Sequence, residues 1–198
     1  CVLAALFMFE GMLTLKQLPV YFANLGETGD GAPRDQDELV RSFTLNRLNG
    51  IAGADSLPTM MSSGFPDAEV LLCAPDGRAI TYKADRYGFN NPDEIYDRPV
   101  ELALLGDSFV EGFCLPPGQD ITSRLRSHGI NAASLGIRGN GPLLELAALG
   151  RFGPTIRPRH VVMAFFEGND WENLRAELTF PFMRNALKPD VDFGSLES

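Results

Sequence analysis

The stretch VELALLGDS at residues 100–108 decides the fold of this 198-residue chain. Its first six residues form a short, largely apolar run, which is typical of a strand buried inside a parallel sheet. Gly106 and Asp107 then predict a sharp exit from the strand, which places Ser108 at the strand's carboxyl end. Ligands bind at that edge in open α/β sheets. Taken alone, Gly106, Asp107 and Ser108 fit a turn or a helix cap better than a ligand site.

Two later segments repeat this pattern of an apolar strand that ends in a polar loop. Residues 131–142 read NAASLGIRGNGP, in which a small apolar strand leads into a glycine-rich loop and Pro142 opens a helix. Residues 160–170 read HVVMAFFEGND, in which an apolar run predicts a third buried strand before a polar cluster. Each segment by itself also fits a plain strand-to-helix turn or an Asx turn.

Parallel strands bring their carboxyl ends to one edge of a sheet, so the three loops are expected to meet. They would deliver the hydroxyl of Ser108, a backbone N–H of Gly139 and the side-chain amide of Asn169. Glycine lets a backbone N–H approach a ligand closely, and an uncharged carboxamide suits an anion that exists only transiently.

The remaining sequence predicts an α/β protein with a parallel sheet, because apolar strands alternate with helices. Pro181 is expected to kink or divide the last helix. The expected strands are 69–73, 79–82, 100–105, 131–135 and 160–166, of which the first two form a hairpin, and the expected helices are 36–48, 119–128, 142–151 and 171–187.

These blocks resemble those of the SGNH hydrolases, also called the GDSL esterase/lipase superfamily. The resemblance rests on Gly106-Asp107-Ser108, on Gly139 and on Gly168-Asn169-Asp170, which match three blocks of that family. The flanking segments DRYGFNNP (85–92) and GNGPLLE (139–145) look like those of bacterial envelope-associated members. The resemblance to this family covers the second half of the chain well and the first half loosely.

The resemblance implies a three-layer α/β/α fold, SGNH/flavodoxin-like, with a small N-terminal helix and β-hairpin extension. Two departures accompany it: Glu167 stands where the third block usually has glycine, and the Asp-x-x-His block that supplies the base is absent. This fold is therefore expected to be incomplete, with the base block beyond Ser198, and residues 1–198 alone are expected to be inactive.

The implied activity is hydrolysis of a carboxylic ester through an acyl-serine intermediate. Ser108 would be the nucleophile, and its own N–H, Gly139 and Asn169 would form the oxyanion hole. Asp107 and Asp170 are expected to brace the turns, because a carboxylate beside a serine disfavours its alkoxide. The implied substrate is an acylated carbohydrate or lipid of the cell envelope. Alternatives are an O-acyltransferase of the same fold, a catalytically dead glycan-binding module and a flavodoxin-like binding domain.

Neither histidine of the chain is placed to act as the base. His160 precedes its strand and His128 ends the helix that returns to the opposite edge of the sheet. Both are therefore expected to lie far from Ser108.

Composition narrows the functional classes. A net charge of −9 argues against binding to nucleic acid and against electrostatic docking on anionic lipid. Cys1, Cys73 and Cys114 are too few and too scattered for a zinc site, and the sequence predicts no cofactor. Cys73 is expected in the core and Cys114 as a buried thiol; a disulfide is open, but the sequence does not pair the cysteines.

Three regions are expected along the chain. Residues 1–22 form a truncated membrane or signal-like apolar segment, or alternatively an amphipathic helix packed on the domain. Residues 23–98 form the extension with helix and hairpin, and 99–198 form the first half of the hydrolase core. The apolar segment, with the resemblance, implies a possible membrane tether and a membrane-anchored or periplasmic location.

Overall fold

The computed structural model describes residues 54–194 and 196 of the chain. The chain divides into two compact units, 1–38 and 39–198, and all described residues belong to the second. The expected apolar segment 1–22 and the helix expected over 36–48 lie outside the described residues. Among those that are described, no helix is long and apolar enough to cross a membrane.

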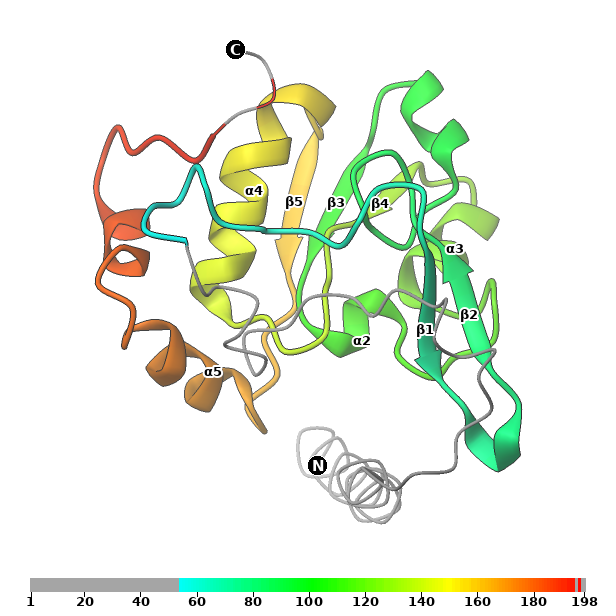
Figure 1. Cartoon of the computed structure of the whole chain (residues 1–198). Helices are drawn as coiled ribbons and strands as arrows, with labels where there is room; N and C mark the ends of the chain where they lie inside the picture. Colours follow the sequence, from blue (N-terminus) through cyan, green and yellow to red (C-terminus); the bar gives the residue numbers. More distant parts are fainter. Residues whose placement is uncertain (1–53, 195, 197–198) are drawn as a thin grey trace, which may run out of the picture. The chain divides into compact units, whose positions relative to one another are not determined.

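The centre of the described region is a parallel sheet of three strands in the order β4-β3-β5 (Figure 1). The strands are β3 (Leu102–Leu105), β4 (Ala132–Ser134) and β5 (His160–Met163). Leu102 pairs with Ala132 on one side and with His160 on the other, so all three strands begin at one edge and end at the other. The predicted parallel α/β arrangement is confirmed.

Helices follow each strand, as expected from the alternation. Asp120 caps α3 by accepting a 2.8 Å hydrogen bond from the Ser123 N–H. Among the described residues, the α-helices are α2 (Ser108–Glu111), α3 (Ile121–Ser127), α4 (Pro142–Ile156) and α5 (Asp170–Glu177). The 3-10 helices are η3 (Pro75–Gly77), η4 (Asp93–Asp97) and η5 (Met183–Leu187). The segment that contains Pro181 is divided into α5 and η5, as predicted, whereas α4 continues past Pro154 and α2 was not expected.

The predicted hairpin is also present. Strands β1 (Glu69–Cys73) and β2 (Ile80–Lys83) pair antiparallel, and Val70, Leu72 and Tyr82 bury a small apolar cluster. A disulfide joins Cys73 to Cys114, which follows α2. Cys73 is buried, as expected, but the prediction of a buried thiol at Cys114 is wrong, because its sulfur is bonded to Cys73 and its side chain is half-buried.

The prediction that strand 160–166 is buried is wrong. Val161, Val162 and Met163 are 42%, 46% and 43% exposed, whereas Ala103 of β3 and Ala133 of β4 are fully buried. Strand order does not account for the difference, because β4 and β5 each have β3 as their only strand neighbour among the described residues. The outer edge of β4 is instead bonded by Asn91, which accepts from the Ser134 N–H at 2.7 Å and donates to Ser134 O at 2.9 Å. Apolar content predicted burial, but burial depends on what covers the strand in the fold.

Candidate functional site

Three polar loops meet at the carboxyl edge of the sheet. Ser108 follows β3, Gly139 follows β4 and Asn169 follows β5, and these are neighbouring parallel strands (Figure 1). The Ile137 N–H donates to the Gly106 carbonyl at 3.3 Å, which joins the first two loops. The Asn169 amide donates to Asp107 at 3.0 Å, which joins the first and the third.

The β3–α2 turn presents Ser108 as the first residue of α2. Asp107 caps this helix, because its carboxylate accepts from the Phe109 N–H at 3.0 Å. A Cβ at Gly106 would lie 2.4 Å from Val110 Cγ2, so the turn packs too closely for a larger residue. Ser108 is half-buried between the buried Asp107 and the exposed Phe109.

The loop after β4 turns sharply at Gly139. Its φ of +80° lies in the left-handed region that favours glycine, and the Asn140 N–H closes the turn on the Ile137 carbonyl at 3.0 Å. Asn140 is in turn joined to α5, since its carbonyl accepts from the Asn173 side chain at 3.1 Å. Both ends of the Gly139 turn are therefore fixed.

The loop after β5 is braced by two buried carboxylates. Asp170 accepts from the Phe166 N–H at 2.6 Å, and Asp107 accepts from the Asn169 side chain. A carboxamide nitrogen has two hydrogens, so the bond to Asp107 leaves a second donor on Asn169. Burial raises the pKa of Asp170, and the nearby Asp107 raises it further.

A cluster of buried acids that sequence reasoning missed lies behind these loops. Glu177 of α5 accepts hydrogen bonds from Gly141 N at 2.7 Å and from Leu143 N at 2.9 Å, so it caps α4. Burial raises the pKa of Glu177 to about 7. Glu145 of α4 is 1% exposed, and among the described residues neither of its carboxylate oxygens has a hydrogen-bond partner.

Burial, reinforced by Asp170, Asp107 and Glu177, raises the pKa of Glu145 to about 8. The sequence signal was available but weak: an acidic residue stands in the first turn of a helix, where it usually remains in solvent.

A second missed feature is a buried ion pair between Glu111 and Arg138. Glu111 is the last residue of α2, and Arg138 directly precedes Gly139. Their charged groups lie 2.9 Å apart, with 0% and 18% of the side chains exposed. No local pattern links residues 27 positions apart, so this pair could not be recognised from the sequence.

Neither histidine lies at the edge that carries Ser108. His160 is the first residue of β5, at the amino end, and His128 caps the carboxyl end of α3 shortly before β4 begins. Within the part of the chain that the structure describes, no group of three or more His, Cys, Asp or Glu side chains could hold a metal ion.

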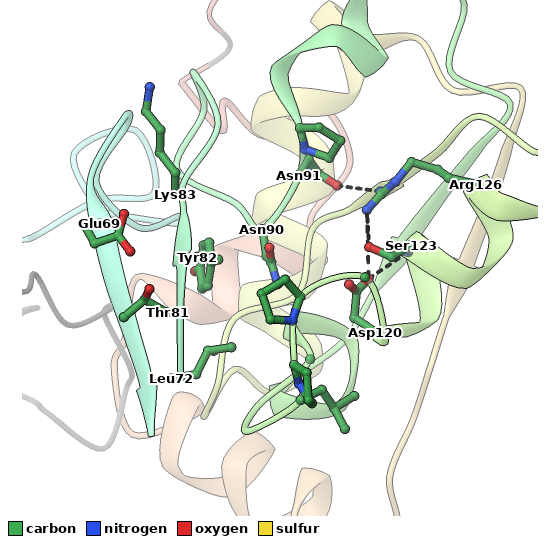
Figure 2. Close-up of a pocket in the computed structure, with 16 residues that line it drawn as sticks. Glu69, Leu72, Thr81, Tyr82, Lys83, Asn90, Asn91, Asp120, Ser123 and Arg126 are labelled. Atoms are coloured by element: carbon green, nitrogen blue, oxygen red, sulfur yellow. Dashed lines mark hydrogen bonds and ion pairs between the residues drawn. The ribbon is translucent and has the colours of Figure 1, made fainter. Parts of the chain in front are cut away.

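A cavity of about 480 Å³ lies elsewhere, beside the hairpin and the segment that leads into α3 (Figure 2). Tyr82, Asn91 and Arg126 line it, and its lining does not include Ser108, Gly139 or Asn169. Arg126 already donates to Ala132 O at 2.8 Å and to Ser123 Oγ at 2.7 Å. The cavity and the three loops are therefore separate features.

Comparison with known proteins does not assign this chain to a family. The chain matches no model of a protein family, no curated protein and no solved structure.

Proposed function

We propose that this chain belongs to a serine-dependent carboxylic ester hydrolase of the SGNH type. The observation that carries the proposal is the hydrogen bond from Asn169 to Asp107, the residue directly before Ser108. It joins the loop of the proposed nucleophile to the loop of a proposed oxyanion donor, 62 residues apart. The three-layer SGNH architecture is part of the proposal.

In the proposed reaction, Ser108 Oγ attacks the ester carbonyl carbon, and a general base takes its proton and later returns it to the departing alcohol oxygen. The carbonyl oxygen becomes an oxyanion, which the N–H groups of Ser108 and Gly139 and the Asn169 amide would stabilise. The bond to the alcohol then breaks, and water hydrolyses the acyl-serine. Removing one such donor typically raises the barrier by about 3–4 kcal/mol.

The proposal assigns the base to neither histidine, because His128 and His160 lie at the other edge of the sheet. Acylation of Ser108 in this chain is accordingly expected to be slow. The proposed substrate is an acylated carbohydrate or lipid of the cell envelope, and a sugar hydroxyl in place of water would make the same site an O-acyltransferase.

A fluorophosphonate probe tests the proposal, because it modifies a serine that lies beside oxyanion donors. We expect one adduct per chain, located at Ser108 by peptide mass spectrometry and absent from Ser108→Ala. Ser127→Ala is the matched control, since Ser127 is an exposed serine of α3 that donates to Arg124 O. If the wild-type chain does not react with the probe over many hours, the proposal that it is a serine hydrolase is refuted.

The same position of the histidines favours a second candidate, a module that binds an acylated glycan without turning it over. Such a module retains the three loops but has no route for the serine proton. Binding of an acetylated oligosaccharide by calorimetry, without any adduct at Ser108, would select this candidate.

A further inference from the structure

The helix that carries Ser108 depends on side chains from elsewhere in the fold. α2 has four residues, and a single helical turn is unstable alone because nucleation fixes several residues for one hydrogen bond. Ser134 Oγ of β4 donates to Val110 O at 3.1 Å, and Asn90 Nδ2 donates to Glu111 O at 2.8 Å. Tertiary contacts thus hold the carboxyl end of α2.

The carboxylate of Glu111 is the most extensively bonded group of this helix. It accepts from Arg138 Nε and Nη2, each at 2.9 Å, and from the Arg138 backbone N–H at 2.8 Å. Tyr82 OH adds a fourth bond at 3.1 Å. A bidentate guanidinium–carboxylate pair fixes orientation as well as distance, because two parallel N–H groups must align with two oxygens.

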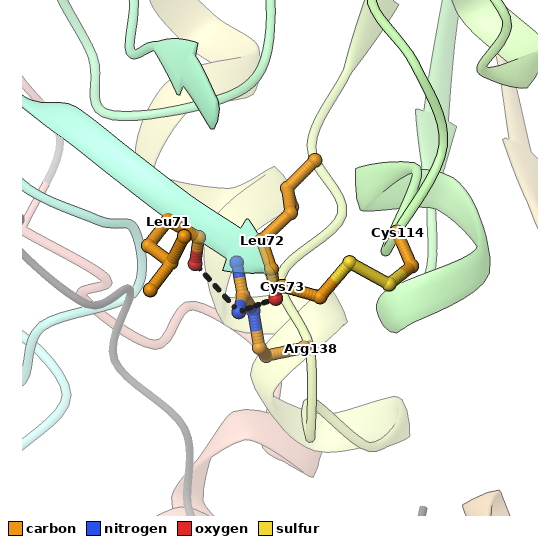
Figure 3. The surroundings of a disulfide bond; sticks show 5 residues. All are labelled: Leu71, Leu72, Cys73, Cys114 and Arg138. Carbon is orange, nitrogen blue, oxygen red and sulfur yellow. Dashed lines mark hydrogen bonds between the residues drawn. A yellow bond between two sulfur atoms is a disulfide. The ribbon is translucent and has the colours of Figure 1, made fainter. Parts of the chain in front are cut away.

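Arg138 also ties this pair to the hairpin. Its Nη1 donates to Leu71 O at 3.0 Å and to Leu72 O at 3.1 Å, at the end of β1 (Figure 3). Its guanidinium lies 5.2 Å from the Phe113 ring centre. Leu72 precedes Cys73, whose disulfide returns to the segment after α2 (Figure 3).

We infer that the Glu111–Arg138 pair positions the Gly139 turn relative to Ser108, an inference that rests on the proposed function. Glu111 lies three residues after Ser108 in one helix, and Arg138 is bonded to Gly139 through the chain. The Glu111 carboxylate also accepts a hydrogen bond from the Arg138 backbone N–H, so it fixes the main chain of Arg138 as well as its side chain. Glu111 and Arg138 are thus positioning residues for the oxyanion hole.

The alternative is that the pair stabilises the fold without setting the site. Arg138→Lys separates the two, because lysine keeps the charge but lacks the planar fork that binds Glu111 and the β1 carbonyls together. Glu111→Gln keeps the shape of the side chain and removes its charge, which provides a second variant should the first fail to fold.

The matched control is Arg126→Lys. Arg126 of α3 is also a largely buried arginine in a pair with an acid: it lies 4.0 Å from Asp120, and 14% of its side chain is exposed. Its hydrogen bonds reach Ala132, Ser123 and Asn91, and none joins α2 to the Gly139 turn.

The experiment measures fluorophosphonate modification of Ser108 over a range of probe concentrations, which separates the maximal rate from the half-saturating concentration. Unfolding temperatures are recorded alongside. A misplacement of about 1 Å slows reaction by about 100-fold. We expect Arg138→Lys and Glu111→Gln to lower the maximal rate by at least about tenfold with little change in half-saturation, and Arg126→Lys to retain the wild-type rate.

Three results would overturn the inference. If Arg138→Lys lowers the unfolding temperature but reacts at the wild-type rate, the pair is structural only. An equal loss of rate in Arg126→Lys shows a general effect of destabilisation. Absence of any Ser108 adduct in the wild-type chain removes the proposed function, and the inference with it.

Discussion

The two neighbours of strand β3 lie in very different surroundings. On the β4 side, Ala132, Ala133 and Ser134 are fully buried, and the charged pair Glu111–Arg138 has hydrogen-bond partners for both members. On the β5 side the strand is exposed, and Glu145 is buried without a partner among the described residues. One half of the candidate site thus contains a paired charge, and the other contains acids whose pKa is raised by burial.

The largest effect is expected from removing one member of the charged pair on the β4 side. Glu111→Ala leaves Arg138 largely buried without its carboxylate, and breaking a buried pair in this manner costs about 3–5 kcal/mol. Urea unfolding at neutral pH measures the loss in the free energy of unfolding.

The control for this prediction is Asp93→Ala. Asp93 pairs with Arg86 at 2.8 Å, but both side chains are nearly half exposed, so the loss is expected to stay below about 1 kcal/mol. Equal losses in the two variants would contradict the distinction between a buried and an exposed pair.

The disulfide of the β4 side is expected to have the next largest effect. Replacing Cys73 and Cys114 together by serine opens a link across 41 residues, which typically lowers the free energy of unfolding by about 2–4 kcal/mol. Wild-type chain unfolded in urea with and without dithiothreitol provides the comparison. Identical midpoints under the two conditions would show that the bond is absent in solution.

The buried acids of the β5 side predict that the free energy of unfolding depends on pH. The pKa of Glu145 is raised from 4.5 to about 8, so between these values the folded chain holds a proton that the unfolded chain has lost. The contribution of Glu145 to the free energy of unfolding is therefore fully present below about pH 4.5 and is lost as the pH rises toward 8, by about 1 kcal/mol per pH unit.

Glu145→Gln isolates this contribution, because glutamine keeps a neutral donor and does not titrate. The difference in unfolding free energy between wild type and Glu145→Gln, followed from pH 5 to pH 8, is expected to change with that slope. Glu177, whose pKa is raised to about 7, contributes in the same direction in both proteins and cancels from the difference. A flat difference would show that Glu145 is ionised in the folded state.

The smallest effect is expected on the exposed strand. Val162→Thr in β5 should change the free energy of unfolding by less than about 0.5 kcal/mol, because the side chain already contacts solvent. Ala133→Val in β4 adds two methyl groups to a fully buried position and should cost about 1–3 kcal/mol. A comparable loss for Val162→Thr in urea unfolding would show that β5 is covered in solution.

Much of the fold follows from local sequence. The runs 69–73 and 100–105 contain β1 and β3, and Pro181 stands where the last helical segment divides. Burial of β5 was predicted wrongly because apolar content reports how apolar a strand is, while its burial depends on which distant segments cover it: Asn91 bonds the outer edge of β4, whereas Val161, Val162 and Met163 of β5 are exposed. Helix α2 was missed because four residues carry no helical periodicity.

In the candidate site, too, local sequence predicted some features and missed others. Ser108, Gly139 and Asn169 were predicted to share one edge because each follows an apolar run and the carboxyl ends of parallel strands lie together; the structure places all three at that edge. The Glu111–Arg138 pair and the Cys73–Cys114 bond could not be found, since their members lie 27 and 41 residues apart.

Among the described residues, the sequence by itself determined where the strands and most of the helices lie and which polar residues end each strand of the parallel sheet. Hydrophobic period and turn chemistry act over a few residues, so they can be recognised without the fold. Only the tertiary structure decided which edge strand is covered, which charges pair and which acids have a raised pKa. Those outcomes depend on burial, and burial is set by segments that are distant in the chain and adjacent in space.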